Sequence, residues 1–313
     1  MTAPPARRLR VLLWHVHGSW TDAFVRGRHY YLLPVSPAKA PWGLGLAGRD
    51  WPSASEVPLD RLAEAEPDVV LLQRPEELEV AGRLGVPAIY VEHNAPRPYA
   101  ASSEHPLAGR SDIPVVHVTH FNEAMWDCGR APVTVVPHGI PDPGARYTGE
   151  LARGVSMINE PMRRRRVTGA DLLETLGDVA PVDVFGLGTE PLGGHLTGRG
   201  DVAAPALHDE IARRRVFLHT ARWTSLGLSL LEAMHLGMPV VAFAATEAIT
   251  AVPPEAGVLS TNVSELVDGF RELLHEPDFA ALAGQNARAY ALKHFGLDAF
   301  LTAWDHLLTE AVR

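Results

Sequence analysis

The 313-residue sequence predicts an α/β protein built from two Rossmann-like, doubly wound domains. Short apolar segments alternate with helix-like segments along the chain, a pattern typical of parallel sheets covered by helices. The length is more than one average α/β core needs and suits two. A stretch rich in proline and glycine, 137–154, separates two regions with the same alternation, and we interpret it as an interdomain linker.

The first region alternates strands and helices in the order expected of a parallel sheet. Its strands are near-continuous apolar runs, as strands buried on both faces require. The predicted strands are 9–16, 30–35, 68–72, 87–91, 115–119 and 133–136, and the predicted helices are 59–65, 76–84 and 122–128.

The second region repeats the pattern and ends in amphipathic helices. Its best-marked helix stops at Gly237, and Pro239 opens the strand after it, which is a recognised stop signal. The predicted helices are 170–176, 207–212, 227–236, 262–275, 279–294 and 297–312, and the predicted strands are 181–185, 216–219 and 240–244.

Composition excludes several classes of protein. The formal net charge of −9 argues against a nucleic acid as the main partner. Cys128 is the only cysteine, so no disulfide can form within the chain, and a reducing compartment, the cytoplasm, is expected. No apolar stretch approaches the roughly 20 residues that span a bilayer, and none near the start resembles a secretory signal.

The most informative segment is 216–244, VFLHTARWTSLGLSLLEAMHLGMPVVAFA. A strand ends near His219, Thr224 or Ser225 can cap the next helix, and Gly227 lets a ligand approach the backbone closely. The start of that helix offers free N–H groups and a positive dipole end to an anion such as a diphosphate. Glu232 is a carboxylate in an otherwise apolar stretch, and it is either part of the site or a solvated helix former.

This segment resembles the C-terminal motif of the retaining glycosyltransferases of family 4. The family pattern is roughly Glu-x-Phe-Gly-Leu-x-x-x-Glu-Ala-Met, followed by Gly-x-Pro-Val-Val. The matching residues are Gly227, Leu228, Glu232, Ala233, Met234, Gly237, Pro239, Val240 and Val241.

The resemblance implies the GT-B fold, with two Rossmann-like domains facing a central cleft. Residues 1–143 would form the acceptor domain, 144–295 the nucleotide-sugar donor domain, and 296–313 a helix that packs back on the first domain. A nucleoside-diphosphate sugar would be the co-substrate, with no separate cofactor, and transfer would retain the anomeric configuration without a metal. Glu232 would hold the ribose. The diphosphate and sugar would lie against the helix start formed by Ser225, Leu226, Gly227 and Leu228.

Thr224 departs from the family pattern, because it stands where the relatives have their first Glu. That Glu would accept hydrogen bonds from the donor sugar. Either the natural donor carries a different sugar, which we favour, or transfer has been lost and the protein only binds a nucleotide sugar or a partner.

Two further segments resemble parts of the family's donor domain. The turn in 182–191, with Gly186 and Gly188, is similar to the turn beside the nucleobase. The run 163–166 contains four arginines, which repel one another, so a bound diphosphate would relieve them. Arg165 or Arg166 is the candidate phosphate ligand, with a solvated basic patch as the alternative.

Candidates in the first region follow predicted strands. Gly18 either lets the backbone approach a phosphate or makes a plain turn. His93 and Asn94 follow the strand 87–91 and are expected at the edge of the cleft, where the family often has a His near the reacting sugar. His93 is therefore a candidate catalytic residue, and a pair that stabilises the loop is the alternative. No spacing of the histidines is diagnostic of a metal site.

The sequence supports glycosyl transfer first and leaves the acceptor, the sugar, the nucleobase and the oligomeric state open. A sugar-nucleotide epimerase of the same fold is the second hypothesis. A degenerate protein that binds without turnover is the third.

Overall fold

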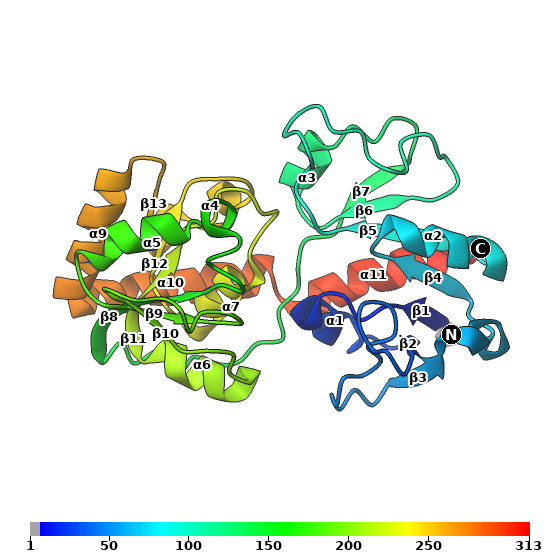
Figure 1. The fold of residues 1–313 in the computed structure, drawn as a ribbon, viewed down its shortest axis with the longest axis horizontal. Helices are drawn as coiled ribbons and strands as arrows, with labels where there is room; N and C mark the ends of the chain where they lie inside the picture. Colours follow the sequence, from blue (N-terminus) through cyan, green and yellow to red (C-terminus); the bar gives the residue numbers. More distant parts are fainter. Residues whose placement is uncertain (1–6) are drawn as a thin grey trace, which may run out of the picture. The chain divides into compact units, whose positions relative to one another are not determined.

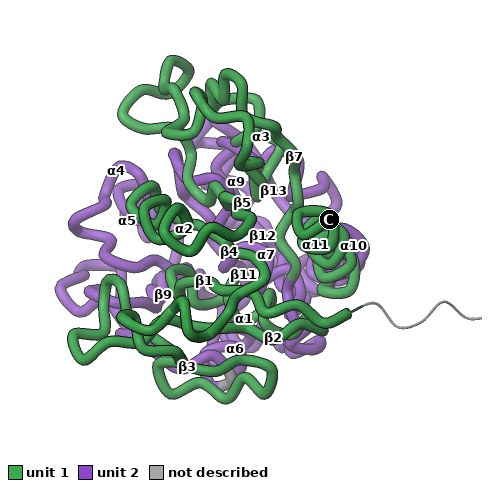
Figure 2. Tube along the Cα trace, turned by 90° about the vertical axis from the view of Figure 1, so that its right-hand side faces the viewer, with its two compact units in different colours: residues 1–139, 297–313 green, residues 140–296 purple. Residues whose placement is uncertain are grey.

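The computed structural model describes residues 7–313, which form two compact units (Figure 1). Unit 1 comprises the chain up to Gly139 together with Leu297–Arg313, and unit 2 comprises Ile140–Gly296 (Figure 2). The domain boundaries expected from the sequence, 143/144 and 295/296, fall beside these limits. Each unit is a parallel α/β sheet with helices, so the predicted fold class is confirmed.

Unit 1 contains a seven-stranded sheet in the order β3-β2-β1-β4-β5-β6-β7, and every strand pair is parallel. The chain therefore starts in the middle of the sheet, winds outward to one edge and then returns to build the other half. The strands are β1 (Arg10–Leu13), β2 (Tyr30–Val35), β3 (Ala54–Pro58), β4 (Val69–Leu72), β5 (Ala88–Glu92), β6 (Val115–His117) and β7 (Val133–Val135).

Short helices cover this sheet, and the last helix of the chain joins them. They are α1 (Gly18–Phe24), η1 (Leu59–Ala65), η2 (Pro75–Glu77), α2 (Leu78–Leu84), α3 (His120–Met125) and α11 (Leu297–Ala311). Trp304 of α11 lies edge-on to Trp20 and Phe24 of α1, with ring centroids 5.7 and 5.2 Å apart. These aromatic contacts fix α11 on unit 1.

Unit 2 contains a six-stranded parallel sheet in the order β10-β9-β8-β11-β12-β13, which has the same winding as unit 1. The strands are β8 (Leu151–Met157), β9 (Val182–Phe185), β10 (Leu196–Gly198), β11 (Arg214–His219), β12 (Val240–Phe243) and β13 (Gly257–Ser260).

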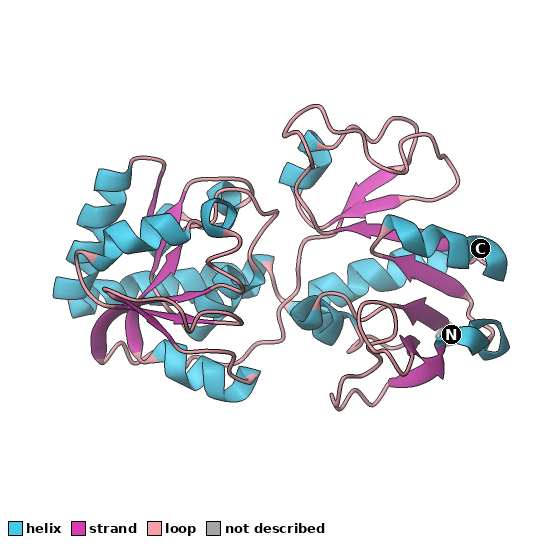
Figure 3. Cartoon of the chain, viewed as in Figure 1, coloured by secondary structure: helices cyan, strands magenta, loops and turns pink. Residues whose placement is uncertain are grey.

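Two helical layers enclose the unit 2 sheet (Figure 3). One apolar core joins the sheet to α6, α7 and α10, and a second joins it to α5, α9 and the start of α10. The helices are α4 (Arg165–Thr168), α5 (Ala170–Gly177), α6 (Ala204–Ala212), α7 (Leu228–Leu236), α8 (Ala248–Ala251), η3 (Pro254–Ala256), α9 (Val263–His275) and α10 (Pro277–His294).

The predicted linker 137–154 is too long, because β8 begins at Leu151 and is a central strand of unit 2. Arg153 and Gly154 interrupt the apolar run that would have marked it. A side chain at Gly154 would not fit, since a Cβ there would lie 2.7 Å from Leu218 Cδ1. Close packing under the sheet therefore requires the glycine that hides the strand in the sequence.

Four strands (β3, β8, β10 and β13) and the helices α1, α4, α8 and η3 in the described chain have no counterpart in the sequence prediction. The strands β3, β10 and β13 lie at sheet edges and are short, so they lack a continuous apolar run. The helix α1 begins at Gly18, where a turn was one alternative, and the predicted helix 122–128 ends at Met125. Among the helices of residues 7–313, none has the length and apolar character needed to cross a bilayer.

Candidate functional site

The candidate donor site lies at the topological switch point of unit 2. The strands β8 and β11 are neighbours, but β8 leads to β9 on one side and β11 leads to β12 on the other. The loops that leave their carboxyl ends, 158–164 and 220–227, therefore diverge. Open α/β sheets bind ligands in the crevice at this point.

Hydrogen bonds to backbone carbonyls join the two connections to each other. Thr220 Oγ1 donates to Thr168 O at 3.0 Å, and Arg222 N donates to Val167 O at 2.9 Å. Gly169 has φ +72°, and a Cβ there would lie 1.8 Å from Thr220 O. Only glycine fits this approach, so the floor of the crevice is rigid and formed by main chain.

The first turn of α7 carries no side-chain cap. Its N-cap residue is Gly227, which has no side chain that could accept a hydrogen bond from the first-turn amides. The prediction that Thr224 or Ser225 caps the helix is wrong, because the helix begins after Gly227 and both residues lie too far upstream. The first-turn N–H groups that have no partner within the helix are the donors that an anion can use.

His219 lies directly beneath the start of α7 and was not considered as a site residue. A Cβ at Gly227 would lie 2.8 Å from His219 Cε1, so glycine is required for this contact. Burial lowers the pKa of His219 to about 4, and the ring is neutral near pH 7. The only sequence signal for it was its place at the end of the predicted strand 216–219.

Glu232 is not a solvated helix residue. Its side chain is 17% exposed, and Oε2 lies 3.7 Å from Nε2 of His208, whose side chain is 16% exposed. That nitrogen is buried and has no hydrogen-bond partner among the described residues. Glu232 thus presents a half-buried carboxylate from α7, and His208 on α6 is a neighbour that sequence reasoning missed, although the helix bearing it was predicted.

Carboxylates already neutralise the arginine run. Arg165 forms a two-pronged ion pair with Glu174, at 2.9 and 2.7 Å, and Arg166 pairs with Asp171 at 2.6 Å. The argument that these charges need a diphosphate for relief is therefore wrong. The side chains of Arg165, Glu174 and Arg166 are exposed, and exposed ion pairs contribute little stability, so either guanidinium can turn to a ligand at small cost.

Arg222 is a further cation of the second loop that sequence reasoning missed. It donates to both carboxylate oxygens of Asp171, at 2.6 and 2.9 Å. Burial alone would raise the pKa of Asp171, but hydrogen bonds from Arg222 and Arg166 leave that pKa below its usual value. Arg166 and Arg222 therefore share one anionic partner at the edge of the crevice.

The turn after β9 lies at the same edge of the sheet. Gly186 has φ +131° and Gly188 has φ +70°, conformations that other residues rarely adopt. A Cβ at Gly186 would lie 2.5 Å from Ile158 O. Leu187 N donates to Asn159 Oδ1 at 3.0 Å, which ties the turn to the connection after β8. The two glycines are thus explained by backbone geometry beside the crevice.

In unit 1, Gly18 and His93 belong to the carboxyl edge of the sheet, after β1 and β5. Gly18 is the first residue of α1, so the plain-turn alternative is wrong. The ring of His93 lies 4.2 Å from that of His17 and 5.0 Å from that of Trp20, measured between centroids. Burial, with His17 and His138 nearby, holds the pKa of His93 well below its usual value.

The cluster His17, His93 and His138 is therefore uncharged near pH 7. Burial lowers the pKa of His17 to about 4 and that of His138 to about 3. Nε2 of His93 has no hydrogen-bond partner among the described residues. A neutral imidazole can exchange hydrogen bonds with a hydroxyl but cannot neutralise a phosphate.

Asn94 stabilises its own loop. Its backbone N donates to Glu92 Oε1 at 2.6 Å, and Trp126 Nε1 donates to its backbone O at 2.9 Å. No group of His, Cys, Asp and Glu side chains within residues 7–313 has the arrangement of a metal site.

A family model described as glycosyl transferases group 1 matches residues 192–290, a stretch that includes Glu232 and all of α7. The chain carries a glycosyltransferase domain. The matched segment begins before β10 and ends within α10, so it covers most of unit 2 and none of unit 1. A search of curated proteins found no relative.

Solved structures with the GT-B fold resemble the whole chain. Sucrose-phosphate synthase from Thermosynechococcus elongatus has a TM-score of 0.75 at 15% identity, over 97% of this chain and 99% of that one. Anabaena HepE in complex with UDP and glucose has a TM-score of 0.75 at 16% identity, over 97% and 100%. The chain spans 55% of the length of Staphylococcus aureus TarM, with a TM-score of 0.66 at 15% identity over 77% of this chain. The GT-B fold is thereby confirmed.

Proposed function

We propose that the protein transfers a sugar from a nucleoside-diphosphate donor, held by unit 2, to an acceptor. The observation that carries the proposal is the uncapped start of α7 at the switch point, with the half-buried carboxylate of Glu232 on the same helix. Amide donors and a hydroxyl-binding carboxylate are the two groups that a nucleoside diphosphate requires.

The donor would bind along α7 and the loops beside it. The diphosphate accepts hydrogen bonds from the amides that follow Gly227, and Glu232 accepts them from the ribose hydroxyls. Arg165 or Arg166 leaves its surface carboxylate to contact the phosphates. The turn at Gly186 and Gly188 lies on the same edge and borders the nucleobase.

Catalysis would rest on stabilising the leaving diphosphate. As the bond from the anomeric carbon breaks, negative charge grows on the phosphate oxygens, and fixed amide dipoles and guanidinium groups oppose it. These groups oppose the charge without a metal ion, so we propose transfer without metal. Retention of configuration is proposed from the resemblance to family 4. His93, uncharged, would hydrogen-bond a hydroxyl of the reacting sugar.

Uridine diphosphate is the first nucleotide to test, because a similar structure, HepE, was determined with UDP-glucose. Calorimetry with UDP, GDP and their sugars measures binding, with and without EDTA. We expect at least one nucleoside diphosphate to bind, and EDTA to leave its Kd unchanged. Absence of binding across the panel contradicts the donor site, and a loss restored by Mg²⁺ or Mn²⁺ contradicts metal independence.

Turnover separates transfer from the other hypotheses. Release of the free nucleoside diphosphate only when an acceptor is present supports transfer, whereas interconversion of nucleotide sugars without an acceptor indicates an epimerase. Binding without turnover across many acceptors would favour a degenerate binder, which the Thr224 substitution makes the relevant alternative. We also propose a cytoplasmic location, since Cys128 is the only cysteine and cannot form a disulfide within the chain, the bond that an oxidising compartment favours.

A further inference from the structure

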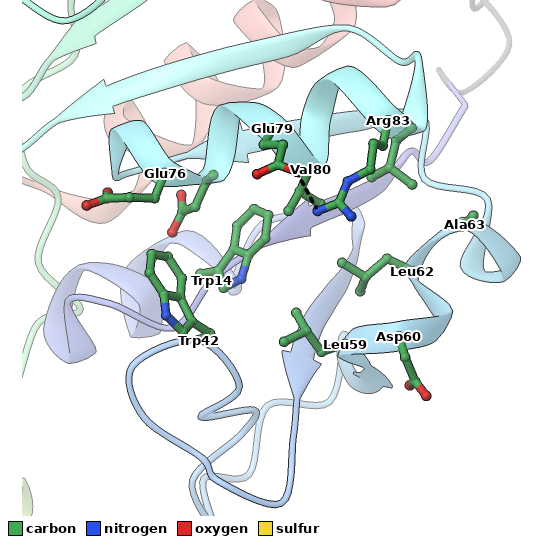
Figure 4. A pocket seen from close by; sticks show the side chains of 12 residues that line it. Trp14, Trp42, Leu59, Asp60, Leu62, Ala63, Glu76, Glu79, Val80 and Arg83 are labelled. Carbon is green, nitrogen blue, oxygen red and sulfur yellow. Dashed lines mark ion pairs between the residues drawn. The ribbon is translucent and has the colours of Figure 1, made fainter.

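Buried nitrogen atoms without an acceptor among the described residues occur in both units. In unit 1, Nε1 of Trp14 is one, and Figure 4 shows this indole in the lining of a cavity. In unit 2, Nε2 of His208 is another, carried by α6. The second is the more informative, because it lies beside Glu232, the carboxylate that the proposed function assigns to the ribose.

Glu232 and His208 do not satisfy each other. Oε2 of Glu232 and Nε2 of His208 are 3.7 Å apart, beyond the reach of a hydrogen bond. In the part of the chain that the structure describes, no hydrogen bond holds the Glu232 carboxylate, so it can turn toward a ligand and open Nε2 to it. The pair therefore offers an acceptor and a donor, side by side, to a bound molecule.

The charge of Glu232 determines which nitrogen of the His208 ring carries the proton. A lone pair on Nε2 would face the carboxylate and be repelled by it, so the tautomer with hydrogen on Nε2 is favoured. The ring then donates from Nε2, whereas the carboxylate only accepts. A ligand that satisfies both groups needs one oxygen that donates and a neighbouring oxygen that accepts.

The spacing of the two side chains is set by the packing of α6 beside α7. The two helices share one apolar core. Arg146 joins them as well: its Nη1 pairs with Asp209 of α6 at 2.8 Å, and its backbone N donates to Leu236 O, in the last turn of α7, at 3.1 Å. His208 and Glu232 are therefore held near each other by the fold, before a ligand binds.

We infer that His208 is a specificity residue of the donor site, and that Glu232 and His208 together bind two neighbouring hydroxyls of a ribose. One hydroxyl donates to the carboxylate of Glu232, and the next accepts from Nε2 of His208. The natural donor is therefore a ribonucleoside diphosphate sugar, and sugars of thymidine diphosphate, which lack the 2′-hydroxyl, are excluded. This inference rests on the proposed function.

The pair rejects a deoxyribose because the loss of either hydroxyl leaves a polar group unpaired. Either Nε2 of His208 remains desolvated without an acceptor, or the carboxylate of Glu232 loses its donor. A site that hydrogen-bonds a substrate hydroxyl discriminates strongly against the analogue without it, since the buried polar group is then left unpaired. The penalty should appear for the 2′-deoxy and the 3′-deoxy analogue alike.

Calorimetry with UDP, 2′-deoxy-UDP and 3′-deoxy-UDP tests this assignment on the full chain. We expect each deoxy analogue to bind the parent about 10- to 100-fold more weakly than UDP. Thymidine diphosphate should bind as 2′-deoxy-UDP does, because the two differ only in the methyl group of the base. If GDP binds more tightly than UDP, GDP and its two deoxy analogues take the place of the uridine series.

Two variants of His208 separate hydrogen bonding from packing. His208→Leu removes the N–H, so UDP affinity should fall about five- to twentyfold. Its preference for UDP over one deoxy analogue should disappear, because the hydroxyl that this analogue lacks no longer has a partner. The preference over the other analogue, whose missing hydroxyl contacts Glu232, should remain. His208→Gln, which keeps an N–H near the position of Nε2, should retain most of both preferences.

The matched control is His275→Leu, which removes an exposed histidine at the end of α9 and should change no affinity. Thermal unfolding verifies that each variant is folded. Binding of either deoxy analogue by the parent as tightly as UDP overturns the assignment of the two hydroxyls. Intact preferences in His208→Leu overturn the role of His208.

A loss of preference in His208→Gln as complete as in His208→Leu also overturns the hydrogen bond from Nε2, since the effect then comes from packing. Failure of the parent chain to bind any nucleoside diphosphate overturns the proposed function instead. The two failures are distinguishable, because the inference about His208 is tested only by the ratio of affinities for UDP and its deoxy analogues.

Discussion

Replacement of Glu232 by glutamine tests the donor site most directly. The change keeps the shape of the side chain and removes only its charge. The carboxylate is mostly shielded from water, and Nε2 of His208 lies 3.7 Å from Oε2, beyond hydrogen-bond distance, so the carboxylate retains acceptor capacity for ribose hydroxyls. Loss of hydrogen bonds to a charged group costs about 1.5–3 kcal/mol. We therefore expect the Kd for the nucleoside diphosphate to rise roughly 10- to 150-fold.

Isothermal titration calorimetry measures this change, and Glu255→Gln is the matched control because it removes an exposed carboxylate elsewhere in unit 2. The control should bind the nucleotide as the parent does. Thermal unfolding tests whether Glu232 has a purely structural role instead of binding the nucleotide. If Glu232→Gln lowers the Tm through the loss of its contact with His208 and leaves the Kd unchanged, the assignment of Glu232 to the ribose is wrong.

Three further predictions concern stability, pH and the donor sugar. Gly169→Ala should lower the free energy of unfolding by at least about 2 kcal/mol in thermal unfolding, because the alanine would combine a positive φ with a clash against Thr220 O. The control Gly82→Ala, in open space within α2, should leave the free energy of unfolding unchanged or raise it. Burial holds the pKa of His219 at about 4, below the unfolded value, so its contribution to stability, present above about pH 6.5, should fall by about 3 kcal/mol as the pH drops towards 4. The other buried histidines add to the same slope in denaturant titrations, so His219→Asn should reduce the slope by this amount, and an unchanged slope contradicts the burial argument. Thr224→Glu should increase affinity for UDP-glucose or GDP-mannose across a donor panel, and a parent that binds such a hexose donor tightly until this change abolishes binding would contradict the placement of Thr224.

The central strands of both sheets could be predicted from sequence, because strands buried on both faces are continuous apolar runs such as 69–72 and 240–243. The exceptions have local physical reasons. The edge strand β3 is largely exposed and reads ASEVP, and the central strand β8 contains Arg153 and a glycine required by close packing. Neither pattern marks a strand unless the neighbouring strands are known.

The segment that forms the donor site could be predicted from the sequence, but the side chains that contact its residues could not. The spacing of Gly227 and Glu232 within 216–244 indicated a helix start and a carboxylate before any coordinates. His208, distant in sequence from that segment, could not be paired with Glu232, because only the packing of α6 beside α7 brings them together. The ion pairs of Arg165 and Arg166 likewise depend on α5, whose acidic residues carry no signal of their own.

The discontinuity of unit 1 has a consequence for the order in which the protein is made. Unit 2 is one continuous stretch, Ile140–Gly296, and its synthesis is complete before α11 is synthesised. Until then Trp20 and Phe24 lack the aromatic layer that Trp304 supplies. Unit 1, which contains the start of the chain, is therefore completed last. A nonsense mutation that removes α11 would destabilise unit 1 rather than unit 2, which directly precedes α11 in the sequence.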